Sequence, residues 1–271
     1  AVVCRSFGEM ASKLDLFVKA RVLGWVDETR VILTAPAADI VNRCLMAAFA
    51  DHLEIITDPV EIAAVQERYP DNRLILDYYR LPDGRVVQRD LAYPFVQRQW
   101  EADGRAPVLA LTEGQKQDGR EALRRLGVPD DAWFAALHVR DPGFFNEDLG
   151  LSPNTFRNVD IGAYGPAIEA IVERGGWVVR LGDQSAPPLP SRPGVVDYAR
   201  SDERSPEMDV FCCAACRFFV GSDSGPVWVA GAFGVPVVET DWSTLGVWPV
   251  PEQDIFVPKT LRDAEGRAMS L

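Results

Sequence analysis

One stretch in the last quarter of the chain decides the fold: FFVGSDSGPVWVAGAFGVPVV, residues 218–238. Phe218 to Val220 is apolar and β-prone, and Val235 to Val238 is β-branched around a proline, so both ends predict strands. The polar residues 222–224 between them supply N-caps for a short helix over 227–233. The stretch therefore reads as strand, tight turn, helix and strand.

The turn at residues 221–225, Gly-Ser-Asp-Ser-Gly, has two interpretations. Its backbone N–H groups and hydroxyls lie at the positive end of a helix dipole, where proteins commonly bind phosphate. Alternatively, Ser222, Asp223 and Ser224 only cap the helix of an ordinary crossover. The small residues 230–232 favour the anion site, because they let the helix backbone approach the sheet and a ligand closely.

The composition limits the possible partners. The chain has 271 residues, 47% of them hydrophobic, which is enough for two domain-sized cores. Its net charge of −12 argues against nucleic acid as the main partner, so an anionic ligand would need a local basic site. No apolar run is long enough to span a bilayer, and the start lacks a signal-peptide pattern, so we expect a cytoplasmic protein. The chain opens on an expected strand, Ala1 to Cys4, which is consistent with a trimmed N-terminus.

Three of the five cysteines are crowded at Cys212, Cys213 and Cys216. This is not the pattern of a secreted disulfide framework. The Cys213-x-x-Cys216 spacing is compatible with a metal or redox site, but there is no second cysteine pair, and His52 and His138 are the only histidines. We expect buried helix residues here and no metal.

Strands and helices alternate along the chain, which predicts an α/β protein with parallel, doubly wound sheets. We place the domain boundary so that residues 1–125 and 126–271 form two halves facing each other across a cleft. In the first half we expect strands at 1–4, 31–34, 53–57 and 108–111, helices at 10–23, 38–50, 59–68 and 93–101, and a hairpin around 82–84. A charged helix capped at Thr112 ends near Gly127. In the second half we expect strands at 133–139, 177–181, 195–197 and 254–257, and helices at 160–174 and 207–215, besides the opening stretch.

A second polar segment, Leu137-His138-Val139-Arg140-Asp141, ends the first strand of the second half. Because ligands bind at the carboxyl ends of parallel strands, Arg140 can share a pocket with the turn at 221–225 and grip two phosphate oxygens. The alternative is a structural Arg140–Asp141 pair with His138 in the core. Dinucleotide, Walker A and Gly-x-Ser-x-Gly motifs are missing, which disfavours dinucleotide binding, P-loop hydrolysis and serine hydrolysis.

Several segments together resemble a known family: residues 33–36 with Asn42 and Arg43, 57–59, 137–141, 157–160, 174–183 and the turn at 221–225 with its helix. They are similar to bacterial glycosyltransferases of the GT-B type that are often found beside tetratricopeptide repeats. More remotely, residues 219–233 resemble the donor-site segment of heptosyltransferases. His138-Val139-Arg140 resembles the His-x-Arg element of fucosyltransferases that use GDP-fucose.

This resemblance implies a GT-B-like enzyme of two Rossmann-type domains, a hexosyl- or deoxyhexosyl-transferase. Its second half would bind a nucleotide-sugar, and its first half a small-molecule or glycan acceptor. A GDP-sugar is favoured by the His-x-Arg likeness alone, with UDP- and dTDP-sugars as alternatives, and no other cofactor is expected. The family's Gly-His after the first strand is replaced here by Gly8-Glu9, which leaves the identity of the catalytic base open.

We assign roles as follows. The diphosphate would be held without a metal by His138, Arg140 and the turn Gly221, Ser222, Asp223, Ser224 and Gly225. Glu9 is the first candidate for the base and Asp141 the second, although Glu9 is also explained as a helix N-terminal carboxylate that stabilises the dipole. Gly182, Asp183 and Asp197 are candidates for nucleoside or sugar contacts. Trp242 and Trp248 would either stack on a sugar or cover a core edge.

Two other functions fit the same residues. A nucleotide-sugar epimerase would need acid and base groups around the sugar but no acceptor cleft. A catalytically silent nucleotide-sugar-binding module would keep Arg140 and the turn at 221–225 yet show no dependence on Glu9 or Asp141.

Overall fold

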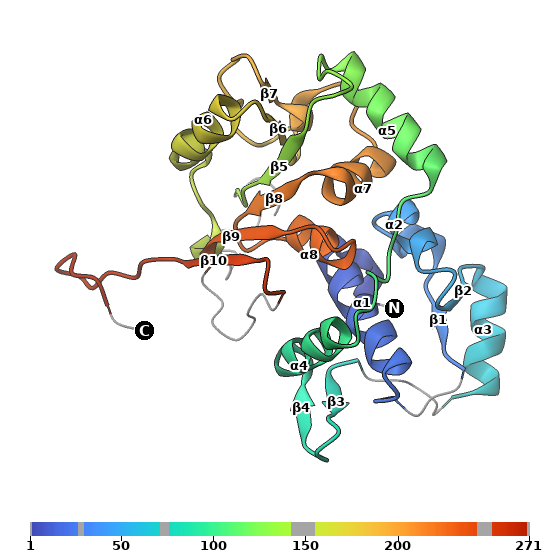
Figure 1. Ribbon diagram of the computed structural model, residues 1–271. Helices are drawn as coiled ribbons and strands as arrows, with labels where there is room; N and C mark the ends of the chain where they lie inside the picture. The colour runs from blue at the N-terminus through green and yellow to red at the C-terminus, as the bar shows by residue number, and fades with distance from the viewer. Residues whose placement is uncertain (1, 27–29, 71–75, 142–154, 243–250, 270–271) are drawn as a thin grey trace.

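The computed structural model describes residues 2–26, 30–70, 76–141, 155–242 and 251–269 (Figure 1). Six parallel strands form the main sheet, in the order β10-β9-β8-β5-β6-β7. All six come from the second half: β5 (Phe134–His138), β6 (Trp177–Arg180), β7 (Val195–Val196), β8 (Phe218–Gly221), β9 (Val237–Trp242) and β10 (Ile255–Pro258). The apolar strand residues of the opening stretch therefore lie at the centre of the sheet, on β8.

Helices cover both faces of this sheet (Figure 1). On one face, α6 (Gly165–Glu173) packs through Ile168 against Leu137, Val178 and Val220. The opposite face carries α5 (Glu113–Arg125), α7 (Pro206–Ala215) and α8 (Gly225–Ala232). The alternation of side chains along each strand sends neighbours such as Val178 and Val179 into these two separate cores.

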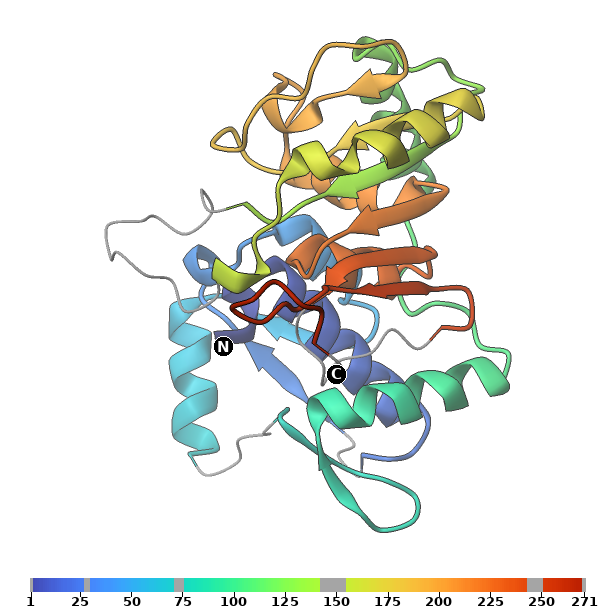
Figure 2. The same cartoon turned by 90° about the vertical axis from the view of Figure 1, so that its left-hand side faces the viewer.

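The first half is built differently. Its described strands form two small sheets: the parallel pair β1 (Ile32–Thr34) and β2 (Glu54–Ile56), and the hairpin β3 (Tyr78–Arg80) and β4 (Val86–Gln88). Around them lie α1 (Phe7–Val22), α2 (Arg43–Ala48), α3 (Pro59–Arg68) and α4 (Arg89–Ala102). Figure 2 shows this half beneath the main sheet, with the β3–β4 hairpin lowest in the view.

The two halves meet where α1 packs against α8. At the crossing, a Cβ added to Gly8 would lie 2.5 Å from the Cα of Gly225, so the two backbones touch and neither helix has room for a side chain there. Beyond this contact, Trp228 of α8 packs edge-on against Tyr93 of α4, with ring centroids 5.4 Å apart. The expected boundary at 125/126 stays a prediction; α5, which precedes it, packs on α7 of the second half through Gly119 and Phe211.

Several expected elements differ in the structure. The strand expected at 1–4 is wrong, because Val2–Arg5 forms a 3-10 helix (η1) whose Cys4 carbonyl accepts from Val41 N rather than from a strand. The segment 108–111 belongs to no strand. The helix expected at 38–50 is divided, because the side chain of Asn42 accepts from Leu45 N and so caps a new helix. The helix expected at 160–174 starts as a 3-10 turn, η6 (Ile161–Tyr164).

Other elements agree closely with expectation. Helix α3 has the expected bounds, with Asp58 capping Val60 N and Glu61 N ahead of Pro59. Helix α5 begins after Thr112, which forms a reciprocal capping box with Gln115. None of the helices in the described ranges combines the length and the apolar character needed to cross a membrane.

Candidate functional site

A cleft of about 990 Å³ lies between the two halves at the carboxyl ends of β5, β6 and β8. Ten of the residues singled out from the sequence line it: Glu9, His138, Arg140, Asp141, Gly182, Asp183, Asp223, Ser224, Gly225 and Trp242. The other three described candidates, Gly221, Ser222 and Asp197, do not. Trp248 lies outside the described residues.

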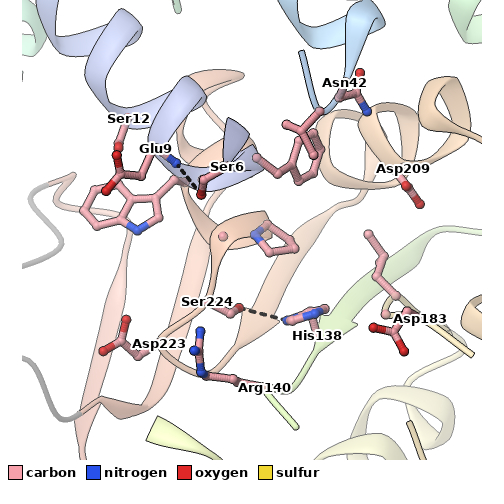
Figure 3. A pocket seen from close by; sticks show the side chains of 18 of the residues that line it. Ser6, Glu9, Ser12, Asn42, His138, Arg140, Asp183, Asp209, Asp223 and Ser224 are labelled. Atoms are coloured by element: carbon pink, nitrogen blue, oxygen red, sulfur yellow. Dashed lines mark hydrogen bonds between the residues drawn. The ribbon is translucent and has the colours of Figure 1, made fainter. Parts of the chain in front are cut away.

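Two helix N-termini point at this cleft. Helix α8 begins at Gly225 after its N-cap residue Ser224, and α1 begins at Phe7 after Ser6, whose hydroxyl accepts from Glu9 N (Figure 3). Because Gly8 and Gly225 are in contact, the positive ends of both dipoles lie side by side. The absence of a side chain at these two glycines is what allows this arrangement.

The turn at 221–225 is fastened to the end of β5. Buried Ser222 accepts a 2.9 Å hydrogen bond from Arg140 N through its hydroxyl, and its own N–H donates to His138 O at 3.2 Å. The hydroxyl of Ser224 lies 2.9 Å from His138 Nδ1 (Figure 3). Ser222 therefore supports the turn from behind, whereas Ser224 and Gly225 face the cleft.

His138 is held in its neutral form. Burial lowers its pKa to about 4, and the positive charges of Arg180 and Arg140 act in the same direction. At neutral pH the imidazole can therefore donate or accept a hydrogen bond but carries no charge. His138 is half-buried and contributes to the cleft wall, so its structural role and its ligand-facing role both stay predictions.

We define the basic wall as Arg140, Arg157 and the turn at 221–225. Arg157 donates through Nη2 to both the carbonyl and the Oδ1 of Asp223, at 2.9 and 2.5 Å. The pKa of Arg140 is lowered by burial and by the charge of Arg157, so the two guanidinium groups lie near each other. Two cations and a helix N-terminus on one wall form a local basic site of the kind that an anionic ligand would require on this acidic chain.

Arg157 lies in the family-like segment 157–160, but its sequence context predicts no role for it. It follows residues 142–154, far in sequence from the end of β5, so no spacing rule connects it with Arg140. Lys259 follows β10, and its Nζ donates to the carbonyls of Phe156 and Asn158, the two neighbours of Arg157. Only the folded chain brings these segments together.

The candidate bases lie on different elements. Glu9 is 46% exposed in the first turn of α1, and its Oε2 lies 2.9 Å from Lys13 Nζ, one turn on. Asp141 lies directly after Arg140 and lines the cleft from the second half. The two interpretations of Glu9 both remain open, because a carboxylate in this place also stabilises the N-terminus of α1.

Acidic residues line one end of the cleft, which we call the acidic end: Asp183, Asp202 and Asp209 (Figure 3 shows the first and last). The carboxylate of Asp183 accepts from the backbone N–H of Ser185, and that of Asp209 accepts from Tyr198 Oη at 2.8 Å. Asp197 was expected beside them but lies outside the cleft, because it forms an ion pair with buried Arg180 and accepts from Leu189 N.

Aromatic residues line another part of the cleft, which we call the aromatic end: Tyr93, Trp228 and Trp242. Trp242 is only 1% exposed and packs between Trp228 and Phe256, with ring centroids 6.2 and 6.4 Å away. This burial favours the interpretation of Trp242 as a residue that covers the core, and stacking of Trp242 on a sugar stays a prediction. Tyr93 and Trp228 were not singled out from the sequence, since each looks like an ordinary apolar position of an amphipathic helix.

The cysteines are free thiols. Cys212 and Cys213 are fully buried, and Cys216 Sγ lies 3.4 Å from the carbonyl oxygen of Cys213. In the part of the chain that the structure describes, no three His, Cys, Asp or Glu residues are grouped to hold a metal ion.

Comparisons with known proteins agree with this architecture. No family model and no curated protein sequence matches the chain. Among solved structures, the ADP-heptose lipopolysaccharide heptosyltransferase II of E. coli aligns over 96% of this chain and 89% of its own, with a TM-score of 0.55 and 14% identity. This similarity confirms the expected GT-B-like α/β fold, and it confirms the likeness to heptosyltransferases as one of fold.

Two further structures align less closely. A glycosyl transferase family 9 protein from Veillonella parvula has a TM-score of 0.44 and 14% identity, with 90% of this chain and 65% of that one covered. The E. coli heptosyltransferase WaaC with ADP-2-deoxy-2-fluoro heptose has a TM-score of 0.43 and 12% identity, with 94% and 90% covered.

Proposed function

We propose that the protein is a glycosyltransferase that moves a hexosyl or deoxyhexosyl group from a nucleotide-diphosphate-sugar to an acceptor hydroxyl, without a metal ion. One observation carries the proposal: Arg140, Arg157 and the N-terminus of α8 share one wall of a cleft whose other wall presents Glu9. The solved structure that aligns with a TM-score of 0.55 is named as a heptosyltransferase, which supports the same class. We place the reaction in cytoplasmic bacterial carbohydrate biosynthesis as part of this proposal.

The basic wall would stabilise the leaving group. As the acceptor oxygen bonds to the anomeric carbon, the bond from that carbon to the diphosphate breaks and its electron pair stays on the diphosphate. Arg140 presents a planar fork of N–H donors for this growing charge, and the free N–H groups of the α8 N-terminus add further donors. Neutral His138 would hold Ser224 in place without adding charge.

The acceptor hydroxyl must lose its proton, and a carboxylate would take it. Glu9 is our first candidate because it stands on the first-half wall, on the opposite side of the cleft from Arg140, and Lys13 restricts its side chain. Asp141 remains the second candidate, next to Arg140 in the chain.

The acidic end would receive the nucleoside. A guanine base presents N1–H and N2–H donors side by side, which one carboxylate can accept together, and ribose hydroxyls are also donors. Asp183 and Asp209 offer such acceptors, which supports GDP-sugars over UDP- or dTDP-sugars, with Gly182 allowing close approach of the backbone.

The first experiment measures thermal stabilisation by GDP, UDP, dTDP and ADP. We expect one nucleotide, GDP first, to raise the Tm of the wild type and to lose most of that effect in Arg140→Ala. A matched control is Arg124→Ala, which removes an exposed arginine of α5 that pairs with Asp130 far from the cleft. No stabilisation by any nucleotide, with the protein folded, would contradict the transferase proposal.

A second experiment separates the roles of the carboxylates. Glu9→Gln and Asp141→Asn are compared for nucleotide binding and for release of nucleoside diphosphate from the donor in the presence of acceptors. Loss of turnover with binding kept, in one of the two, identifies the base. Full turnover in both would show that neither is the base, and binding without turnover in the wild type would identify a binding module instead.

A further inference from the structure

The aromatic end has features that the proposed donor site does not use. Trp228 and Tyr93 are half-buried and face each other edge-on, with ring planes at 85°. Behind them, buried Trp242 supports Trp228 with ring planes at 65°. An aromatic platform held from behind, but open to a cleft, resembles a surface for stacking more than an interior contact.

The platform lies next to the candidate base. Gly225 and Trp228 are three residues apart on α8, and Gly8 and Ser12 are four apart on α1, so each pair shares one face of its helix. Because Gly8 and Gly225 touch, Ser12 and Trp228 lie about one helical turn beyond the same crossing. Figure 3 shows Glu9 and Ser12 together, on the side of the pocket away from Asp183 and Asp209. A ligand on the platform would therefore be close to Glu9.

The charges at this end cancel locally. Glu9 pairs with Lys13 at 2.9 Å, and Arg89 Nε donates to Asp90 Oδ1 at 2.8 Å. The basic wall holds two arginines with Asp223 and Asp141 as acidic neighbours, and it adds the positive end of the α8 dipole. The aromatic end thus offers an apolar ring face and hydrogen-bonding groups of both kinds, with no excess charge to attract an anion.

We propose that the aromatic end is the acceptor subsite and that it takes an uncharged pyranoside. The C–H face of a pyranose ring would stack on Trp228, while its hydroxyls would bond to the polar atoms of Asp90, Arg89 and Ser12. One hydroxyl then points at Glu9. This inference rests on the proposed function, because a sugar bound here is an acceptor only if a donor occupies the basic wall.

The test uses saturation-transfer NMR on the whole protein with methyl glycosides as probes. The panel contains the methyl pyranosides of glucose, galactose, mannose and N-acetylglucosamine, and methyl glucuronide as an anionic counterpart of the same size. We expect saturation transfer to the ring C–H protons of at least one uncharged member, and at least several-fold weaker saturation transfer to the glucuronide. Added nucleotide should not change either signal.

Variants locate the sugar. Trp228→Leu removes the stacking face and should abolish the saturation transfer to the glycoside. Arg140→Ala, on the basic wall, should leave that NMR signal unchanged. Because Trp228 also packs in the protein, Asp90→Asn serves as a second variant; it changes an exposed side chain and should weaken sugar binding severalfold without lowering Tm. Saturation transfer to the glycoside that survives both Trp228→Leu and Asp90→Asn would overturn the assignment of the sugar site to the aromatic end. Loss of that signal in Arg140→Ala would overturn it as well.

The outcomes separate this inference from the proposed function. Nucleotide stabilisation without binding of any uncharged glycoside would contradict the acceptor subsite alone. Glycoside binding that depends on Trp228, without stabilisation by any nucleotide, would contradict the transferase proposal and leave a sugar-binding site. Preference for the glucuronide would refute an uncharged acceptor.

Discussion

The two halves of the molecule bury polar groups in different ways. In the first half, Asp15 of α1 is 1% exposed, and its Oδ2 lies 2.6 Å from Lys19 Nζ, which also donates to Gln97 of α4. In the second half, Glu239 of β9 is 4% exposed, and the charges that act on it are those of Asp254 and Asp223; its Oε2, like Asp15 Oδ1, makes no hydrogen bond. The first half pairs its buried carboxylate with a cation, whereas the sheet half keeps a carboxyl that is best accommodated as the neutral acid.

The same contrast applies to the backbone. The six-stranded sheet fastens the basic wall through hydrogen bonds between β5 and the turn at 221–225. The first half has only short strand pairs, and its α1 reaches the cleft by packing on α8. A wall anchored in a large sheet keeps its groups in a fixed geometry, as the proposed diphosphate site requires, while the other wall depends on a helix–helix contact.

The largest effect should come from breaking that contact. Gly8→Val places a side chain into the backbone of α8 and should destabilise the protein by roughly 3 kcal/mol or more, because no flexible group can move aside. The matched control is Gly231→Ala on α8, where an added Cβ meets nothing within 4 Å and should raise stability slightly. Urea denaturation measures both. Equal stability of Gly8→Val and the wild type would show that the halves do not depend on this crossing.

The second effect concerns pH. Burial, aided by Asp254 and Asp223, raises the pKa of Glu239 from 4.5 to about 8, so the folded state holds a proton that the unfolded state releases. The contribution of Glu239 to the free energy of unfolding is therefore fully present below pH 4.5 and is lost as the pH rises towards 8. Between pH 5 and 7 the free energy of unfolding should fall by roughly 2 kcal/mol because of this group.

Glu239→Gln should remove this loss, so that its Tm falls less than that of the wild type over the same pH range. Asp254, whose pKa burial raises to about 6, contributes a smaller loss of the same sign in both proteins. Parallel curves for the two proteins would contradict a protonated Glu239.

The third effect tests how the sheet fastens the basic wall. Ser222→Ala leaves the N–H of Arg140 without its 2.9 Å partner in a buried place, which should cost roughly 1–2 kcal/mol and weaken nucleotide binding. Ser6→Ala removes the corresponding serine of the first half, an exposed cap with a 3.4 Å bond to Glu9 N, and should cost about 0.5 kcal/mol. Thermal denaturation compares the stability losses of the two variants. A larger loss in Ser6→Ala than in Ser222→Ala would contradict the contrast between the two walls.

The smallest effect should come from the C-terminal segment. Lys259→Met removes the ammonium group that bonds to the carbonyls of Phe156 and Asn158, so Arg157 should be held less firmly. We expect the Kd for the stabilising nucleotide to rise severalfold with little change in Tm. Arg262→Met, whose side chain bonds to Gly266 O within the same segment, is the control. An unchanged Kd in Lys259→Met would show that Arg157 keeps its place without Lys259.

The sequence by itself determined the sheet half. Residues 218–238 predict β8, α8 and β9 because a strand, a polar N-cap and a helix of small residues follow one another, and these signals act over a few residues. The same holds for Thr112 and Pro59 at their helices. It also grouped His138 and Arg140 with the turn, since parallel strands must end at one edge.

Only the tertiary structure decided the rest. Residues 2–5 and 108–111 have apolar sequences that suit strands, but a strand needs a neighbour for its hydrogen bonds, and no local signal supplies one. Arg157 and Lys259 reach the basic wall, and Tyr93 reaches Trp228, through contacts between distant segments. Ser222 and Asp197 turned away from the cleft because buried partners, Arg140 N and Arg180, hold them there. Local propensity sets the elements, whereas packing across the cleft sets which side chains face a ligand.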